Sequence, residues 1–168
     1  HHAPPARVLS VLTFSSEQQQ FRDSLRRMLA ADYSFARRRE IAASARGWSA
    51  ATWRQLAELG VLALTLPEAH GGLGGGAMDA YVVMEEAGRA LLLEPWLPTV
   101  LMGAGVIARA GSADQCAAIL PAVGAGERQL ALAHYEPGAR YALDAVSSEA
   151  RRDEGGWVIS GAKTYVLN

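Results

Sequence analysis

Apolar residues recur with a helical period over most of the first 127 positions. Ser15-Ser16-Glu17-Gln18 has the form of a capping box, and the apolar residues that follow it fall on one helical face. Ser112-Ala113-Asp114-Gln115 repeats that form, and Ser49 and Gly60 mark the start and end of a short helix. The pattern predicts helices from residue 15, over 49–60, 78–93 and 99–110, and from 112 into the 121–127 stretch. The 78–93 segment is apolar on nearly all sides, which is typical of a mostly buried helix.

The pattern changes to that of extended chain from about Gln129. Residues 130–133, 157–159 and 165–167 are strand-like, residues 146–152 are extended and polar, and residues 153–156 have the composition of a hairpin turn. The sequence therefore predicts an α+β multidomain fold, with an N-terminal arm (1–14), an all-α helical domain (15–127) and the first strands of an antiparallel β domain (128–168). Because two or three strands cannot bury a sheet face alone, we expect the β domain to be incomplete and the chain to be a piece of a longer one.

Composition excludes several classes of protein. The net charge is -1, with 16 basic and 17 acidic residues, so no global field attracts nucleic acid. No apolar run approaches the roughly 20 residues of a membrane helix, which predicts no membrane association. The single cysteine, Cys116, fits a reducing, cytoplasmic setting and is better explained as a buried structural thiol than as a nucleophile. No spacing typical of a metal site occurs.

The glycine-rich stretch around residues 67–76 allows two interpretations. From Gly72 it contains G-x-G-x-x-A, which is close to the fingerprint of dinucleotide-binding folds. However, residues 67–70 separate these glycines from the apolar run before them, and residues 95–111 predict a helix where a parallel strand is needed. We therefore favour a tight turn between buried elements. His70 beside the glycines is a candidate base or ligand, but without a neighbouring partner it is better explained as a turn residue.

Adjacent carboxylates at Glu85 and Glu86 are candidates for acid–base catalysis. Adjacent helical residues point about 100° apart, so these two do not face one another. An ion pair between Glu85 and Arg89, four residues on, explains the pattern better. The residues alone identify no catalytic group.

Several phrases, taken in order, resemble the acyl-CoA dehydrogenase family. Each is weak alone, but together they cover nearly the whole chain from Ser15 to Asn168. They are WRQLAELGV (53–61), LPE to GGLG (66–74), EEAGR (85–89), the segment 111–127, EPGA (136–139) and GGWVISGAK (155–163). The order of helices and then strands also matches that family, which has an N-terminal helical domain, a middle β domain and a C-terminal helical domain. The C-terminal domain is absent from this chain.

The resemblance implies a flavin enzyme. Members hold FAD between the middle domain and the C-terminal helices, and oxidise an acyl-CoA to its trans-2-enoyl form. The base is a glutamate of the C-terminal domain, beyond Asn168, so no catalytic residue is expected here. Electrons pass to an electron-transferring flavoprotein, and the resemblance implies a homo-oligomer or a hetero-oligomer with another acyl-CoA dehydrogenase subunit.

The phrases depart from the family pattern where FAD is expected. Tyr135 stands where the family has Thr or Ser, and Leu167 replaces a second hydroxyl residue. Backbone groups of Leu132, His134 and Tyr135 still allow bonds to a flavin, and Tyr165 still allows stacking on it. The resemblance thus implies a cofactor site at these five positions. Equally, they are ordinary strand residues if the chain is a subunit with a weakened or absent flavin site.

These departures resemble one branch of the family, the small-subunit type of pimeloyl-CoA dehydrogenase and of heteromeric steroid-degrading enzymes. In such heteromers a degenerate chain pairs with one that keeps the flavin contacts. Analogy with the family places Leu97 and Met102, within residues 96–107, against the acyl chain, and places Tyr141 against the substrate. A plain core helix explains residues 96–107 equally well. Three hypotheses stay open: an FAD-dependent acyl-CoA dehydrogenase subunit, a non-catalytic partner subunit, and a flavin oxidase of the same fold.

Overall fold

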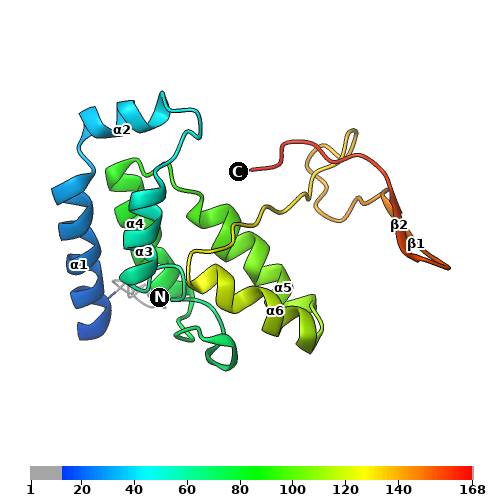
Figure 1. The fold of residues 1–168 in the computed structure, drawn as a ribbon, viewed down its shortest axis with the longest axis horizontal. Helices are drawn as coiled ribbons and strands as arrows, with labels where there is room; N and C mark the ends of the chain where they lie inside the picture. Colours follow the sequence, from blue (N-terminus) through cyan, green and yellow to red (C-terminus); the bar gives the residue numbers. More distant parts are fainter. Residues whose placement is uncertain (1–12, 168) are drawn as a thin grey trace, which may run out of the picture.

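The computed structural model describes residues 13–167. Figure 1 shows the helices gathered in one body, with a two-stranded hairpin projecting beyond them at the end of an extended segment. No helix within residues 13–167 is long and apolar enough to cross a membrane. The elements, in which η1 is a 3₁₀-helix and η2 a π-helix, are α1 (Ser16–Asp32), α2 (Phe35–Ala42), α3 (Ala50–Glu58), η1 (Glu68–His70), α4 (Ala77–Ala90), η2 (Leu97–Ala104), α5 (Gly105–Ala110), α6 (Ala113–Gly124), β1 (Glu149–Asp153) and β2 (Gly156–Ser160).

Serine caps begin the helices that the sequence assigns to them. The Ser15 hydroxyl accepts a hydrogen bond from the Gln18 N–H at 3.2 Å, and the Gln18 side chain accepts one from the Ser15 N–H at 3.0 Å. Ser112 forms the same capping box at α6, and Ser49 caps α3. Each cap satisfies helix N–H groups that otherwise lack a partner, which is worth about 1 kcal/mol. The predicted starts of these helices are therefore confirmed.

The buried core lies between the helices and includes the run 61–66, which forms turns between α3 and η1. Trp96 is 1% exposed, and its indole N–H donates to the Val61 carbonyl at 3.0 Å. The Trp53 indole likewise donates to the Gly126 carbonyl at 3.0 Å. Both large side chains thus bury apolar area without leaving a polar atom unpaired. These bonds tie the start of η2 and the end of α6 to the α3 region.

The helix predicted over residues 78–93 is present as α4, but its predicted end and its mostly buried character are wrong. α4 ends at Ala90, because Leu91 adopts a left-handed conformation with φ 52°. α4 packs on α1 along one face, while Tyr81 and Met84 are 47% and 38% exposed. Its buried side chains are Val82, Val83 and Glu86.

The single helix predicted over residues 99–110 is also corrected, because η2 and α5 occupy this region in succession. In η2 the backbone is wound as a π-helix, a rare form that often occurs at functional sites. Thr99 and Gly103 of this helix contact Leu130, in the segment that follows α6. The Thr99 hydroxyl donates to the Leu130 carbonyl at 3.2 Å and accepts from the Leu130 N–H at 3.3 Å. A Cβ at Gly103 would lie 2.5 Å from the Leu130 Cβ, so only glycine permits this approach.

Within residues 13–167 the β structure is one antiparallel hairpin, in which Glu149 pairs with Ser160 and Asp153 with Gly156. The turn predicted at residues 153–156 and the strand at 157–159 are confirmed. Residues 130–133 and 165–167 have no regular secondary structure, which contradicts the prediction of strands there. A strand requires a neighbour to complete its ladder, and no described strand lies beside either segment. Every residue of β1 and β2 is exposed.

Candidate cofactor and substrate site

Two segments that are far apart in sequence and have no regular secondary structure meet beyond the helices. The Thr164 N–H donates to the Tyr135 carbonyl at 2.9 Å, and the Lys163 ammonium lies 3.4 Å from the His134 carbonyl. The rings of His134 and Tyr135 are 5.2 Å apart and meet edge to face. The structure therefore brings together the segments 132–135 and 163–167, which contain the five residues predicted for a cofactor.

These five residues differ in what they offer a ligand. Tyr135, Tyr165 and Leu167 are 39%, 82% and 52% exposed, whereas Leu132 and His134 are half-buried. Because the carbonyls of His134 and Tyr135 already accept hydrogen bonds, they are less available than the sequence interpretation assumed. Among residues 13–167, no hydrogen-bond partner is found for the backbone N–H groups of Leu132, His134 and Tyr135. The groups available to a ligand are thus these three backbone N–H groups and the rings of Tyr135 and Tyr165.

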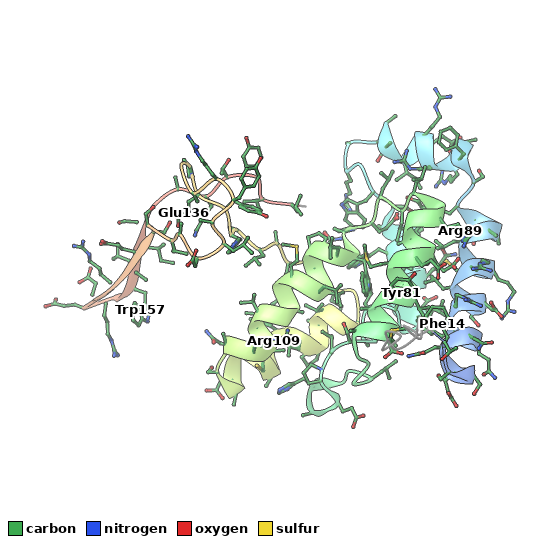
Figure 2. The ribbon with its side chains drawn as sticks, turned by 180° about the vertical axis from the view of Figure 1, so that it is seen from behind. Phe14, Tyr81, Arg89, Arg109, Glu136 and Trp157 are labelled. Carbon is green, nitrogen blue, oxygen red and sulfur yellow. The ribbon has the colours of Figure 1, made fainter. Side chains whose placement is uncertain are left out.

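Glu136 is the residue that sequence reasoning missed. It is 4% exposed and lies between the helical body and the hairpin that carries Trp157 (Figure 2). One carboxylate oxygen accepts the Ser148 N–H at 3.0 Å and the Lys163 ammonium at 2.7 Å. The other accepts the N–H of Ser147 at 2.6 Å and also its hydroxyl.

The hydrogen bond from Lys163 and those from Ser147 and Ser148 hold the pKa of the Glu136 carboxyl far below its ordinary value of 4.5. The only sequence signal for this cluster was the presence of Glu136 and Lys163 in two different family-like phrases. The two residues are 27 positions apart, and the helix and strand periods predict contacts only between residues that are close in the sequence. The sequence pattern therefore did not predict that they pair.

The residues predicted to contact the substrate do not converge. Leu97 lines a cavity of about 340 Å³ between α4 and the start of η2, together with Met84, Ala87 and Pro98. Met102 is half-buried and lies on the same helix as Leu97. Tyr141 is 98% exposed on the loop between Glu136 and β1. Of the three, Leu97 borders this hollow, while Met102 and Tyr141 do not line it.

A larger cavity, of about 610 Å³, lies between the start of α4 and the η2–α5 helices. Its walls are mostly small or apolar and include Ala80, Leu101 and Ala108, and Arg109 is the one charged residue among those that line it. Figure 2 shows Arg109 near the far end of α5. Gly75 and Gly76 of the glycine-rich stretch border this cavity.

The glycines form a turn, as the favoured interpretation predicted. Gly71 and Gly74 have φ values of 78° and 66°, which side chains rarely adopt. At Gly72 a Cβ would lie 2.0 Å from the Leu66 carbonyl oxygen. The glycines thus permit the chain to fold back closely on the apolar run, which accounts for their number without a nucleotide. His70 ends the 3₁₀-helix η1 in this turn.

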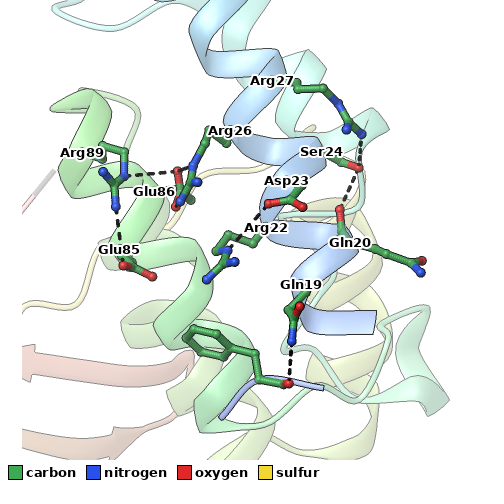
Figure 3. A network of polar contacts seen from close by, with 11 residues as sticks. Gln19, Gln20, Arg22, Asp23, Ser24, Arg26, Arg27, Glu85, Glu86 and Arg89 are labelled. Atoms are coloured by element: carbon green, nitrogen blue, oxygen red, sulfur yellow. Dashed lines mark hydrogen bonds and ion pairs between the residues drawn. The ribbon is translucent and has the colours of Figure 1, made fainter. Parts of the chain in front are cut away.

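The adjacent carboxylates of α4 belong to a network of ion pairs with α1, drawn in Figure 3. Arg89 lies 3.7 Å from Glu85, which confirms the predicted pair, and 3.6 Å from Glu86. Glu86 is 1% exposed and receives two hydrogen bonds from the Arg26 guanidinium. The bonds from Arg26 lower the pKa of Glu86 and raise that of Arg26. A buried carboxylate held by cations in this way is a poor proton acceptor.

Cys116 has the surroundings of a structural residue. Cys116 is 6% exposed, and its thiol donates to the Ile107 carbonyl at 3.3 Å, as expected of a structural thiol. Within residues 13–167 no group of three or more His, Cys, Asp or Glu side chains is arranged to hold a metal ion.

Comparisons with known proteins agree on one family. The family model described as acyl-CoA dehydrogenase, N-terminal domain, matches residues 15–127. Acyl-CoA dehydrogenase FadE12 of Mycobacterium tuberculosis is 37% identical over 117 residues, which are 68% of this chain and 30% of that protein. The chain thus spans less than a third of the length of this relative.

Solved structures show the same relationship. A variant of the Tcur3481-Tcur3483 steroid ACAD is 34% identical with a TM-score of 0.80, covering 89% of this chain and 41% of that one. An acyl-CoA dehydrogenase from Bacillus anthracis, complexed with FAD, has a TM-score of 0.79 over 91% of this chain and 27% of its own. At 24% identity, this second likeness concerns the fold alone.

Proposed function

The chain belongs to the acyl-CoA dehydrogenase family, and on that premise we propose that the whole protein is an FAD-dependent acyl-CoA dehydrogenase subunit. Its reaction would be the α,β-dehydrogenation of an acyl-CoA thioester to the 2-enoyl-CoA, with electrons passed to an electron-transferring flavoprotein. The observation that carries this proposal is the match over residues 15–127 together with the meeting of segments 132–135 and 163–167.

The described residues fit a flavin through backbone donors and aromatic faces. The N–H groups of Leu132, His134 and Tyr135 are available to the carbonyl and nitrogen acceptors of an isoalloxazine edge. The exposed ring of Tyr165 offers a face for stacking, and Leu167 offers apolar contact. When bound, the flavin would supply the hydride acceptor, while these residues bind and orient it.

We place the acyl group against η2. Leu97 and Met102 lie on this helix, and the cavity that Leu97 lines has apolar walls in Met84, Ala87 and Pro98, with Glu94 as the one charged residue among those that line it. An acyl chain loses no hydrogen bonds on entering such a hollow and removes apolar surface from water. Tyr141 would contact the substrate from the exposed loop.

The buried carboxylates Glu86 and Glu136 are bound to cations and are not the base. Because the acyl-CoA dehydrogenase resemblance assigns the base to the C-terminal domain, we infer that the α-proton is removed by a group outside residues 13–167.

The test uses the full-length protein with an artificial electron acceptor. Conversion of medium-chain acyl-CoA thioesters to 2-enoyl-CoA is followed by chromatography, with flavin content measured on the same sample. We expect enoyl product in proportion to bound FAD. Protein that binds FAD and forms no enoyl-CoA from any thioester, with or without a co-expressed partner, would contradict the proposed reaction.

A second candidate is a non-catalytic partner subunit of a heteromeric enzyme. Leu167 carries no hydroxyl and Tyr135 carries a bulky phenol, which favours a weakened flavin site. The substitutions Tyr135→Thr and Leu167→Thr separate the two candidates. Altered FAD occupancy would show that this chain's own site binds the cofactor, whereas unchanged occupancy of the assembled enzyme would favour the partner role.

A further inference from the structure

We propose that Glu136 and Lys163 form a positioning pair, which fixes the two flavin-facing segments against each other without touching the flavin. This inference rests on the proposed function and assigns the pair a role within that same site. The two side chains are joined at 2.7 Å, and both lie next to residues of the candidate cofactor site.

The Glu136 carboxylate joins its own chain segment to two segments further along the sequence. Glu136 receives hydrogen bonds from Ser147 and Ser148, 11 and 12 residues away, and from Lys163, 27 residues away. Between the end of α6 and the start of β1, the described chain has no regular secondary structure. Hydrogen bonds to the ionised Glu136 carboxylate therefore hold these segments together, as the backbone hydrogen bonds of a β-sheet do in other folds.

The Glu136–Lys163 pair lies next to the candidate cofactor residues in both segments. Tyr135 precedes Glu136, and Thr164, which donates to the Tyr135 carbonyl at 2.9 Å, follows Lys163. The Lys163 ammonium also reaches the His134 carbonyl at 3.4 Å. Any shift of the Glu136–Lys163 pair is therefore passed to the backbone of both segments.

The backbone at Tyr165 adopts a left-handed conformation with φ 51°. An aromatic residue rarely occupies this region, and such a conformation persists only where its surroundings fix it. The pair lies two residues before Tyr165, and it anchors the chain where this turn of the backbone begins. It thereby helps to fix the direction in which the Cα–Cβ bond of Tyr165 leaves the backbone.

A direct catalytic role for Glu136 does not fit these contacts. The side chain is 2% exposed, and both carboxylate oxygens already accept hydrogen bonds. A general base needs an accessible oxygen within reach of the substrate proton. Glu136 therefore acts through the backbone that it holds.

The experiment compares full-length wild-type protein with Glu136→Gln, Lys163→Met and Lys163→Arg. Glu149→Gln is the matched control, because Glu149 also pairs with a basic side chain but is 61% exposed on β1. FAD dissociation constants and flavin absorption spectra are measured for all variants, and hydrogen exchange of the Thr164 amide is measured without FAD. Circular dichroism and thermal melting identify any variant that fails to fold.

In folded protein we expect Glu136→Gln and Lys163→Met to weaken FAD binding by about tenfold or more, since each removes charge-assisted hydrogen bonds. Both should also shift the flavin spectrum and accelerate exchange at Thr164 by about tenfold. Lys163→Arg should recover most of the affinity, and Glu149→Gln should match the wild type.

Unchanged exchange at Thr164 in Glu136→Gln would overturn the proposal, because the pair would then not hold the segments together. Faster exchange with an unchanged FAD affinity and spectrum would also overturn it, because the pair would then serve only the fold. If wild-type protein binds no FAD, the proposed function fails. In that event unchanged exchange at Thr164 still shows that the pair does not hold the two segments together, and accelerated exchange shows that the pair holds them for the fold alone.

Discussion

At the scale of single residues, Glu86 shows how a charge is accommodated among helices. Its carboxylate is 1% exposed and is held by Arg26, whose own side chain is 43% exposed. The two partners are therefore not equivalent. Removing Arg26 leaves a buried anion with the more distant Arg89 as its ion-pair partner, whereas removing the charge of Glu86 leaves a cation that water still reaches.

We predict that Arg26→Met destabilises the protein more than Glu86→Gln does. An uncompensated buried charge costs about 3 kcal/mol, and the loss of charge-assisted hydrogen bonds alone costs about 1–2 kcal/mol. Urea unfolding measures both differences. Arg37→Met serves as the control, because the Arg37–Glu40 pair is exposed on both sides and is worth about 0.5 kcal/mol or less. Equal losses for Arg26→Met and the control would contradict the assigned role of the pair.

The same residue predicts how stability depends on pH. The hydrogen bonds from Arg26 lower the Glu86 pKa in the folded state below its ordinary value of 4.5. A lowered folded pKa means that this contribution is complete above about pH 4.5 and is lost as the pH falls through the folded value. The stability difference between wild type and Glu86→Gln should be constant from pH 8 to 5 and should narrow in stronger acid. A difference that instead grows as the pH falls would be the wrong sign for this account.

At the scale of elements, η2 determines where the chain leaves the helical body. Thr99 pairs with both backbone groups of Leu130, and Gly103 lets the Leu130 side chain pack on the helix backbone. The segment that leads to the candidate cofactor residues is therefore fixed at its start by a π-helix.

We predict that Gly103→Ala destabilises the protein by about 1–3 kcal/mol, because the added methyl group overlaps Leu130. Gly88→Ala on α4 is the matched control, since no atom outside its own helix lies within 4 Å of the new Cβ. There the substitution should stabilise the helix by about 0.5–1 kcal/mol. Thermal unfolding of both variants gives the comparison, and a stabilising Gly103→Ala would show that Leu130 does not dock on η2 as described.

Helix starts and the hairpin were predictable from the sequence because each depends on residues close together in the chain. A serine cap binds the backbone N–H three residues further on, as Ser15 binds that of Gln18. The turn at residues 153–156 joins two strands that follow each other directly in the sequence. The π-helical winding of η2 and the exposed face of α4 were not predictable. The winding of η2 and the exposure of α4 depend on which element packs against each helix, as Leu130 packs on Gly103. The hydrophobic period of a helix does not show which distant residue will pack on it.

At the scale of the whole molecule, the candidate site was predictable only in part. The family resemblance selected the segments that contain Tyr135 and Tyr165, and the structure brings those segments together. It did not indicate that Glu136 joins them, because the contact spans 27 residues without a period. Whether these residues bind FAD stays a prediction.

The proposed activity of the whole protein is the oxidation of acyl-CoA by a bound flavin. The most direct measurement is an anaerobic titration of full-length, FAD-loaded protein with an acyl-CoA thioester, followed by the flavin absorption spectrum. We predict loss of the oxidised flavin bands in step with added thioester and the appearance of enoyl-CoA in equal amount. A fully oxidised spectrum after excess thioesters of varied chain length and ring character, in protein that retains its FAD, would contradict the account.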